Sequence, residues 1–297
     1  MWKKILRRAG AVLLVVLALL GVALAYAGFQ VDARLTRSWD VAAMPLAIGA
    51  DDSRASRGAH LAATRGCNDC HGADLGGRVL VDDPTARIVA SNLTAGQGGV
   101  LSAYSDAELA RAIRHGLRRD GRSLLLMPTA DYYPFGDEDV AALIAYLRQL
   151  SPVDRVLGGS QLHLPARVLL AYAGAPWLSA ETIDHAAPRA AVPAAAASVD
   201  YGRYVASTCL TCHGGHFAGG IVNGPPGTPA SANLTPAGRL RDWSEADFLT
   251  VMREGRTPEG RALRPEVMPW PAFAKMDETE LRALWMFLRA LPPAAVN

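Results

Sequence analysis

The longest apolar stretch of the chain lies near its N-terminus. Residues 9–29 carry no charged side chain, and four basic residues within 3–8 precede them. About twenty helical residues span the core of a bilayer, and a basic flank stays on its cytoplasmic side. We therefore predict a membrane anchor over 1–30 and an extended connector over 31–54. A cleaved signal peptide is the alternative, because Ala23-Leu24-Ala25 resembles a cleavage site. In both cases the rest of the chain is exported.

Two amphipathic patterns occur in the remainder of the chain, one in each half. Apolar residues at the i, i+3, i+4 and i+7 positions mark one face of a helix. They are Val140, Leu143, Ile144 and Leu147 and, 141 positions later, Leu281, Leu284, Trp285 and Leu288. Ser105 and Ser244, each followed by an acid three residues later, predict helices that begin with a capping box. The Gly- and Pro-rich stretches 72–99 and 214–239 are predicted to be loops.

Further matches indicate that the two halves arose by duplication. Asn92-Leu93-Thr94 recurs as Asn233-Leu234-Thr235, and Met127-Pro128 recurs as Met268-Pro269, each 141 positions later. A constant offset of this kind indicates a repeated structural unit, which should be recognised before a fold is assigned. The repeat provides two copies of one structural unit, and both copies predict helices joined by long loops.

The repeats divide the chain into domains. We predict an all-α fold with a first domain over 55–151 and a second over 199–293. The segment 152–198 between them is too long for a simple linker and contains a short amphipathic helix near 165–172. Half of the residues are apolar and a fifth are charged, as in globular proteins. The net charge of +2 comes with no basic patch, so nucleic acid is not an expected partner.

The four cysteines form two Cys-x-x-Cys-His motifs. The motif residues are Cys67, Cys70 and His71 in the first half and Cys209, Cys212 and His213 in the second. This spacing is the attachment signature of a c-type haem, because two thiols on one turn reach two vinyl groups and the adjacent histidine binds the iron. A thiol–disulfide redox pair or a shared zinc site is the alternative, but zinc does not require a histidine after each pair. We predict two covalently bound haem c groups.

Each half resembles a class I cytochrome c domain. Both contain a helix leading into Cys-x-x-Cys-His, a long loop, a Met-Pro segment and a closing helix. With Asp-Gly-Arg at 120–122 before Met127, this order resembles the membrane-bound cytochrome c subunits of periplasmic alcohol, aldehyde and gluconate dehydrogenases. Those subunits usually carry three haem motifs, whereas this chain has two. The resemblance implies two tandem class I cytochrome c domains preceded by a single N-terminal transmembrane helix.

Candidate axial ligands follow from equivalent positions in the repeats. Met127 and Met268 lie where the resemblance places a methionine ligand, and a thioether raises the potential of the iron. Core methionines that fill gaps in packing are the alternative. The resemblance also implies that a proline carbonyl downstream of the motif accepts a hydrogen bond from the proximal histidine. Pro84 and Pro226 fit this role, with ordinary loop prolines as the alternative. The predicted iron ligands are therefore His71, Met127, His213 and Met268.

These features predict an electron-transfer protein rather than an enzyme, because six-coordinate irons offer no open site to a substrate. The expected donor is a dehydrogenase or a quinol-oxidising complex, and the expected acceptor is a terminal oxidase or a small soluble cytochrome. We expect the chain in the cytoplasmic (inner) membrane of a bacterium, with its haem domains on the periplasmic side. The alternatives are an integral subunit of a haem-copper oxidase complex and a dihaem peroxidase or thiosulfate-oxidising enzyme.

Overall fold

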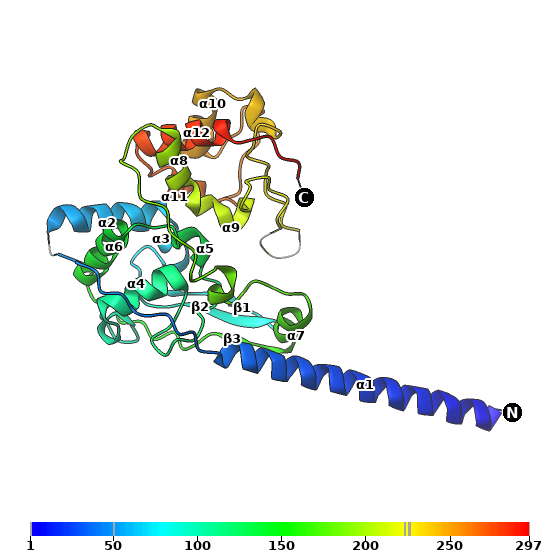
Figure 1. The fold of residues 1–297 in the computed structure, drawn as a ribbon. Helices are drawn as coiled ribbons and strands as arrows, with labels where there is room; N and C mark the ends of the chain where they lie inside the picture. Colours follow the sequence, from blue (N-terminus) through cyan, green and yellow to red (C-terminus); the bar gives the residue numbers. More distant parts are fainter. Residues whose placement is uncertain (1, 50, 223, 225–226, 297) are drawn as a thin grey trace.

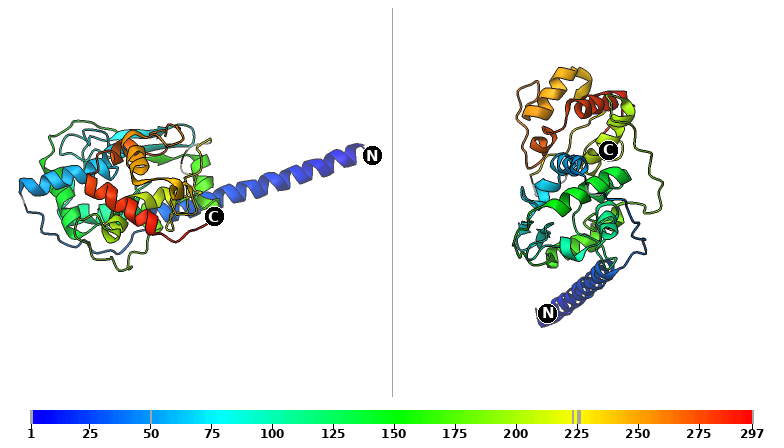
Figure 2. Two further views of the ribbon diagram at one scale, coloured as in Figure 1. Left: turned by 90° about the horizontal axis from the view of Figure 1, so that it is seen from above. Right: turned by 90° about the vertical axis from the view of Figure 1, so that its left-hand side faces the viewer.

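The computed structural model describes residues 2–49, 51–222, 224 and 227–296. A long N-terminal helix, α1 (Trp2–Thr36), projects from two stacked lobes (Figure 1). Domain 1 is next to α1, and domain 2 lies on the side of domain 1 away from α1 (Figure 2). The predicted all-α class is confirmed, apart from one small sheet in the first lobe.

Domain 1 is built around the packed pair of helices α2 and α6. Its elements are α2 (Asp52–Thr64), α3 (Cys67–His71), β1 (Arg78–Asp82), β2 (Ala86–Ala90), η1 (Leu101–Ala103), α4 (Asp106–His115), α5 (Thr129–Tyr132) and α6 (Asp137–Gln149). Val140 and Ile144 on the predicted apolar face are fully buried in one core with Leu61 of α2. Gly58 permits this packing, because a Cβ there would lie 2.0 Å from the carbonyl oxygen of Ala142.

Domain 2 repeats the same arrangement. Its elements are α8 (Val199–Val205), η3 (Ala206–Cys209), α9 (Leu210–His213), η4 (Arg239–Asp242), α10 (Glu245–Glu254), α11 (Trp270–Phe273) and α12 (Glu278–Ala290). Helix α8 packs on α12 through Gly202, where a Cβ would lie 1.9 Å from the carbonyl oxygen of Ala283. Leu281 and Leu284 are buried in the core, as the amphipathic pattern predicted.

The predicted helix starts are confirmed. The Ser105 side chain accepts a hydrogen bond from the Glu108 amide, and the Glu108 carboxylate accepts one from the Ser105 amide. Ser244 and Asp247 form the same reciprocal pair at the start of α10. Such a capping box stabilises a helix because it satisfies amide groups that have no partner within the helix.

The segment between the domains adds β3 (Gln161–Leu162), α7 (Leu164–Tyr172) and η2 (Ser179–Thr182) to the first lobe. The short helix expected near 165–172 is thus present as α7. The prediction of a loop over 72–99 is wrong in part, because β1 and β2 pair antiparallel there and β3 extends the sheet. Burial of Ile88 against Ala166 of α7 favours strand structure at this point.

Helix α1 is longer than the sequence pattern predicted. The anchor was predicted to end at residue 30, with an extended connector from 31 onward, but the helix continues to Thr36. Tertiary contacts explain the difference. Val31 is fully buried beside Leu170 of α7, and Arg34 forms an ion pair with Glu181 at 2.5 Å. By length and composition, α1 is able to cross a membrane.

Candidate functional site

The first Cys-x-x-Cys-His motif forms a single helical turn. Helix α3 spans Cys67–His71 and is preceded by Gly66 in the left-handed region, at φ 83°. Gly72 ends the turn, also at positive φ. A residue with a Cβ adopts a positive φ only at an energetic cost, so the flanking glycines allow the chain to enter and leave the turn sharply. Both thiols and the imidazole therefore lie on one short turn.

The second motif has the same local form. Cys209 ends η3, and α9 spans Leu210–His213. Gly214 follows at φ 76°, as Gly72 follows His71. Both motifs are half-buried at the edge of their domain cores. The duplicated sequence has thus produced two equivalent sites, one in each domain.

A backbone carbonyl orients each histidine. The Nδ1 atom of His71 donates to the carbonyl oxygen of Ser91 at 2.8 Å, and that of His213 donates to Ala232 at 2.8 Å. Because a carbonyl only accepts, the proton lies on Nδ1 and Nε2 has a lone pair available for a metal. Burial lowers the pKa of both histidines, which favours this neutral form.

These contacts correct the assignment of Pro84 as the acceptor for His71. Pro84 lies exposed in the turn between β1 and β2, and the hairpin returns the chain so that Ser91 meets the imidazole instead. Pro226, proposed for His213, lies outside the described residues, and the carbonyl that meets His213 is that of Ala232. Each histidine thus has a backbone carbonyl partner, and for His71 it is Ser91 rather than the predicted Pro84.

The repeated Asn-Leu-Thr sequence holds these acceptors in place. Asn92 directly follows Ser91 and donates to the carbonyl oxygen of Val153 at 2.7 Å. Asn233 directly follows Ala232 and donates to that of Ala294 at 2.7 Å. This repeat is visible in the sequence, which gives no sign of its role. Its adjacency to the acceptor residue is the signal by which Ser91 and Ala232 could have been found.

Three of the four thiols have a raised pKa, which disfavours disulfide exchange. Burial raises the pKa of Cys67 and of Cys209 to about 12, and burial also raises the pKa of Cys70. A redox-active cysteine needs a lowered pKa, because the thiolate is the nucleophile. The redox-pair alternative is therefore disfavoured. Neutral thiols in apolar surroundings are compatible with covalent attachment to a haem.

Each predicted methionine shares a core with its motif. Met127 packs on the same apolar cluster as Cys67, and Met268 packs on the same cluster as Cys209. In domain 1 the hydroxyl of Tyr132 also donates to the carbonyl oxygen of Arg65 at 2.8 Å, which ties the segment after Met127 to the start of the motif. Two thiols, an imidazole with a free Nε2 and a nearby thioether fit a c-type haem in each domain. Ligation by the methionines stays a prediction.

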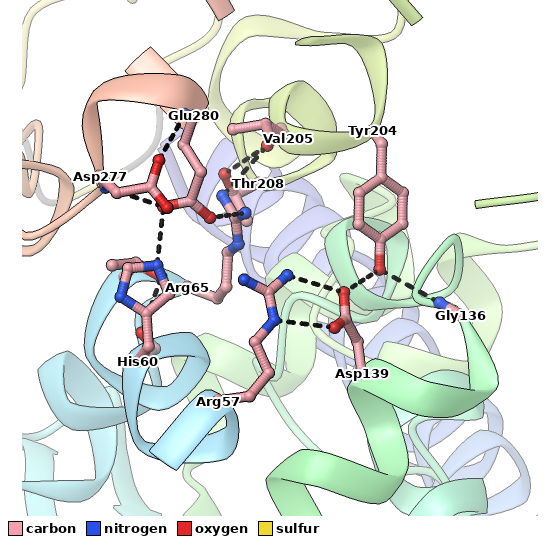
Figure 3. A network of polar contacts seen from close by, with 11 residues as sticks. Arg57, His60, Arg65, Gly136, Asp139, Tyr204, Val205, Thr208, Asp277 and Glu280 are labelled. Carbon is pink, nitrogen blue, oxygen red and sulfur yellow. Dashed lines mark hydrogen bonds and ion pairs between the residues drawn. The ribbon is translucent and has the colours of Figure 1, made fainter. Parts of the chain in front are cut away.

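The two domains meet through buried polar contacts (Figure 3). Glu280 of α12 is fully buried and accepts from Arg65 at 2.9 Å and pairs with His60 at 2.7 Å. Burial alone would raise the pKa of Glu280, but the His60 hydrogen bond and the Arg65 charge lower it below its ordinary value. On the domain 1 side, Asp139 accepts from Arg57 at 3.1 Å and from Tyr204 of domain 2 at 2.5 Å. These pairs fix the relative position of the two sites.

One contact joins the two sites more directly, and sequence reasoning missed it. Asp131 of α5 accepts hydrogen bonds from both the amide and the hydroxyl of Thr211, each at 2.8 Å. Thr211 lies between the two cysteines of the second motif, and Asp131 lies four residues after Met127. Burial raises the pKa of Asp131 to about 7, although the Thr211 hydrogen bonds oppose this.

Comparison with known proteins gives matches in both domains. The sequence model of the cytochrome c family matches residues 55–151 and 199–292. The chain is 26% identical over 273 residues to the fructose dehydrogenase cytochrome subunit of Gluconobacter japonicus, which covers 81% of this chain and 53% of that protein.

Two further relatives carry similar names. The chain is 25% identical over 292 residues to the alcohol dehydrogenase (quinone) cytochrome c subunit of Komagataeibacter europaeus, which covers 88% of this chain and 62% of that protein. It is 30% identical over 122 residues to the gluconate 2-dehydrogenase cytochrome c subunit of Pantoea cypripedii, or 39% of this chain and 28% of that protein. The chain spans less than two thirds of each relative's own length.

Proposed function

Because the chain belongs to the cytochrome c family, with one haem-attachment motif in each matched domain, we propose that it relays single electrons at a membrane. Electrons enter from a dehydrogenase or a quinol-oxidising complex and leave to a terminal oxidase or a small soluble cytochrome. Helix α1 anchors the chain in the cytoplasmic membrane, with both domains on the periplasmic side. The names of the relatives, all subunits of dehydrogenases, support a dehydrogenase as the donor.

The observation that carries the proposal is the same donor set in both domains. His71 and His213 each present an unprotonated Nε2, because Nδ1 donates to a backbone carbonyl. A thioether lies on the same core in each case. Haem c bound in this setting supplies a reversible one-electron couple at its iron. The residues of the chain orient the axial imidazole, exclude water from the apolar side and hold the two sites at a fixed separation.

The inter-domain contacts favour a relay between two fixed centres and disfavour two carriers that act independently. Electron tunnelling depends steeply on distance, so a relay requires two centres that do not drift apart. The contacts of Glu280 with Arg65 and of Asp131 with Thr211 cross the interface between the domains. Both are buried between the domains, and a shift of one domain against the other would leave a buried polar group without its partner. The interface therefore favours one fixed arrangement.

The proposal is tested on the purified full chain by intact mass and by a redox titration followed by absorption. We expect two covalent haems and two one-electron steps. The matched variants C67A/C70A and C209A/C212A should each lose one haem and one of the two steps. A mass without haem, or a high-spin iron that turns over peroxide, would reject the relay and favour the enzymatic alternative.

A further inference from the structure

We propose that α7 is embedded in the lipid interface beside α1, so that domain 1 rests on the membrane surface. This inference depends on the membrane anchoring of α1 proposed above. In Figure 1, α7 lies against α1 at the end where α1 meets domain 1. Three observations support the inference: the rigid contact between the two helices, the position of that contact along α1, and the chemistry of the exposed side chains.

The contact between α1 and α7 is a packed one. Ala27 and Val31, one turn apart on α1, are buried, and Val31 shares an apolar cluster with Leu170 of α7. Arg34 donates to the carbonyl oxygen of Leu170 at 2.6 Å, near the end of α7 where carbonyls lack helical partners. Because the two helices are held together in this way, α7 has a fixed position along α1.

That position lies within the apolar part of α1. The hydroxyl of Tyr172 donates to the carbonyl oxygen of Ala23 at 2.6 Å. The charge-free run spans 9–29, so Ala23 lies six residues, or about 9 Å, inside its outer end. If the membrane-spanning part of α1 ended one helical turn earlier, the depth of Ala23 below that end would fall by about 5 Å, and Ala23 would still lie inside the span. Tyr172 therefore reaches below the level at which the hydrocarbon begins.

The exposed side chains at this level suit lipid rather than water. On α7, Leu169 is 45% exposed and Tyr172 is 54% exposed. On the adjoining part of α1, Tyr26 is 53% exposed and Phe29 is 70% exposed. Apolar side chains with tyrosines at the edge are typical of the interfacial region of a bilayer. A water-exposed helix would be expected to carry charges at these positions.

The single charged residue of α7 has its charge neutralised. Arg167 forms an ion pair with Asp32 at 2.7 Å and also donates to the carbonyl oxygen of Gly28 at 3.1 Å. Asp32 is the first charged residue after the apolar run and lies about 5 Å beyond its end along the helix, at the depth of the lipid headgroups. The charges of this region thus begin where the hydrocarbon ends.

This arrangement places domain 1 against the membrane, because both α1 and α7 belong to its lobe. Domain 2 is displaced from domain 1 across the axis of α1 rather than along it, as Figure 1 shows. The first site therefore belongs to the lobe that holds the membrane contact, and the second lies beside it in the lobe that contains neither α1 nor α7.

The test measures how fast single cysteines react with a water-soluble maleimide. Leu169→Cys is compared with Met286→Cys, a domain 2 residue of similar exposure at 40%, and with Val16→Cys inside α1, at 52%. The full chain with both haems attached is placed in phospholipid nanodiscs. Its native cysteines do not react, because they form the thioether bonds to the haems. Intact mass follows the reaction, and the haem spectrum verifies folding. Thiols in apolar surroundings react slowly, because they rarely ionise.

We expect Leu169→Cys and Val16→Cys to react at least about tenfold more slowly than Met286→Cys, because a tenfold loss of thiolate requires a pKa shift of only about one unit. Equal rates for Leu169→Cys and Met286→Cys, with Val16→Cys still slow, would retain the anchor and overturn the embedding of α7. A fast reaction at Val16→Cys would overturn both. Neither result affects the haem count, which tests the electron relay separately.

Discussion

The two domains have the same scaffold, but their buried acids depend on the interface to different degrees. Asp139 and Glu280 occupy equivalent positions, 141 residues apart, near the starts of α6 and α12. Asp139 retains a partner from its own domain, Arg57, beside Tyr204 of the other domain. Glu280 has both side-chain partners, Arg65 and His60, in the other domain. Equivalent residues of the two domains thus make unequal contacts across the interface.

The asymmetry means that domain 2 depends on domain 1 more than the reverse. The charged partners of Glu280 come from domain 1, whereas Asp139 keeps Arg57 within its own domain. In the assembled interface, a fully buried charge that loses its partner is strongly destabilising. The following predictions compare the two sides of the interface, from the largest expected effect to the smallest.

Replacing Arg65 by methionine should have the largest effect. The variant removes the cation that neutralises the buried Glu280 carboxylate and leaves it with His60 and the Asp277 amide as partners, which costs about 3–5 kcal/mol of unfolding free energy. Guanidinium unfolding of the holo protein, followed by circular dichroism, measures the loss. Arg282→Met is the matched control, because its ion pair with Glu278 is exposed and contributes at most about 0.5 kcal/mol. A loss as small as that of the control would show that Glu280 does not depend on domain 1.

Asp131 should make the unfolding free energy of the protein depend on pH. Burial raises its pKa from 3.8 to about 7, so the folded state prefers the protonated acid. Stability from this group is fully present below pH 3.8 and is lost as the pH rises through 7. Since one pKa unit corresponds to about 1.4 kcal/mol, the loss by pH 8 is at most about 4 kcal/mol.

Asp131→Asn is the variant that isolates this effect, because the amide oxygen can still accept from Thr211. We expect its unfolding free energy to vary less between pH 5 and pH 8 than that of the parent chain, and to exceed the parent value at pH 8. Parallel pH profiles for the two proteins would exclude Asp131 as the source.

Replacing the glycine at each helix crossing tests whether the two domains share the same close helix packing. A Cβ at Gly58 or at Gly202 would meet a backbone carbonyl oxygen of the facing helix at 2.0 or 1.9 Å. Each Gly→Ala change should therefore cost about 2–3 kcal/mol, as overpacking does elsewhere. Gly159, where the structure offers open space, provides a control substitution. Unequal losses at Gly58 and Gly202, measured by thermal unfolding, would show that the two cores are less alike than their geometry indicates.

Tyr204→Phe should have the smallest effect. It removes the 2.5 Å hydrogen bond to Asp139 and the 3.2 Å bond from the Gly136 amide, and it leaves the carboxylate paired with Arg57. The expected loss is about 1–2 kcal/mol, the usual net value of two hydrogen bonds. A loss comparable to that of Arg65→Met would contradict the asymmetry, because it would make Asp139 as dependent on the partner domain as Glu280 is.

Much of the fold was predictable because the sequence carries local signals for it. The apolar run predicted α1, the capping boxes at Ser105 and Ser244 predicted two helix starts, and the duplicated spacing predicted two equivalent sites. Each of these patterns is read within a few residues, or by comparing one half of the chain with the other. The amphipathic faces of α6 and α12 were likewise found in the buried cores.

The parts that were missed depend on contacts distant in sequence or on the backbone. Strand β3 pairs with β2 from more than seventy residues away, so no local pattern predicts its place in the sheet. Ser91 and Ala232 act through carbonyl oxygens, which every residue has, so their side chains give no signal. The Asp131–Thr211 contact joins two domains and has no counterpart in the repeat: the residue equivalent to Asp131 is Ala272.

Replacing the two methionines tests most directly whether each domain binds its iron between a histidine and a methionine, as we propose. In a redox titration of the full chain, Met127→Ala should lower one midpoint potential and Met268→Ala the other, each by on the order of 100 mV, because the thioether stabilises reduced iron. The other haem in each variant serves as an internal reference. Unchanged potentials and low-spin spectra in either variant would contradict the account.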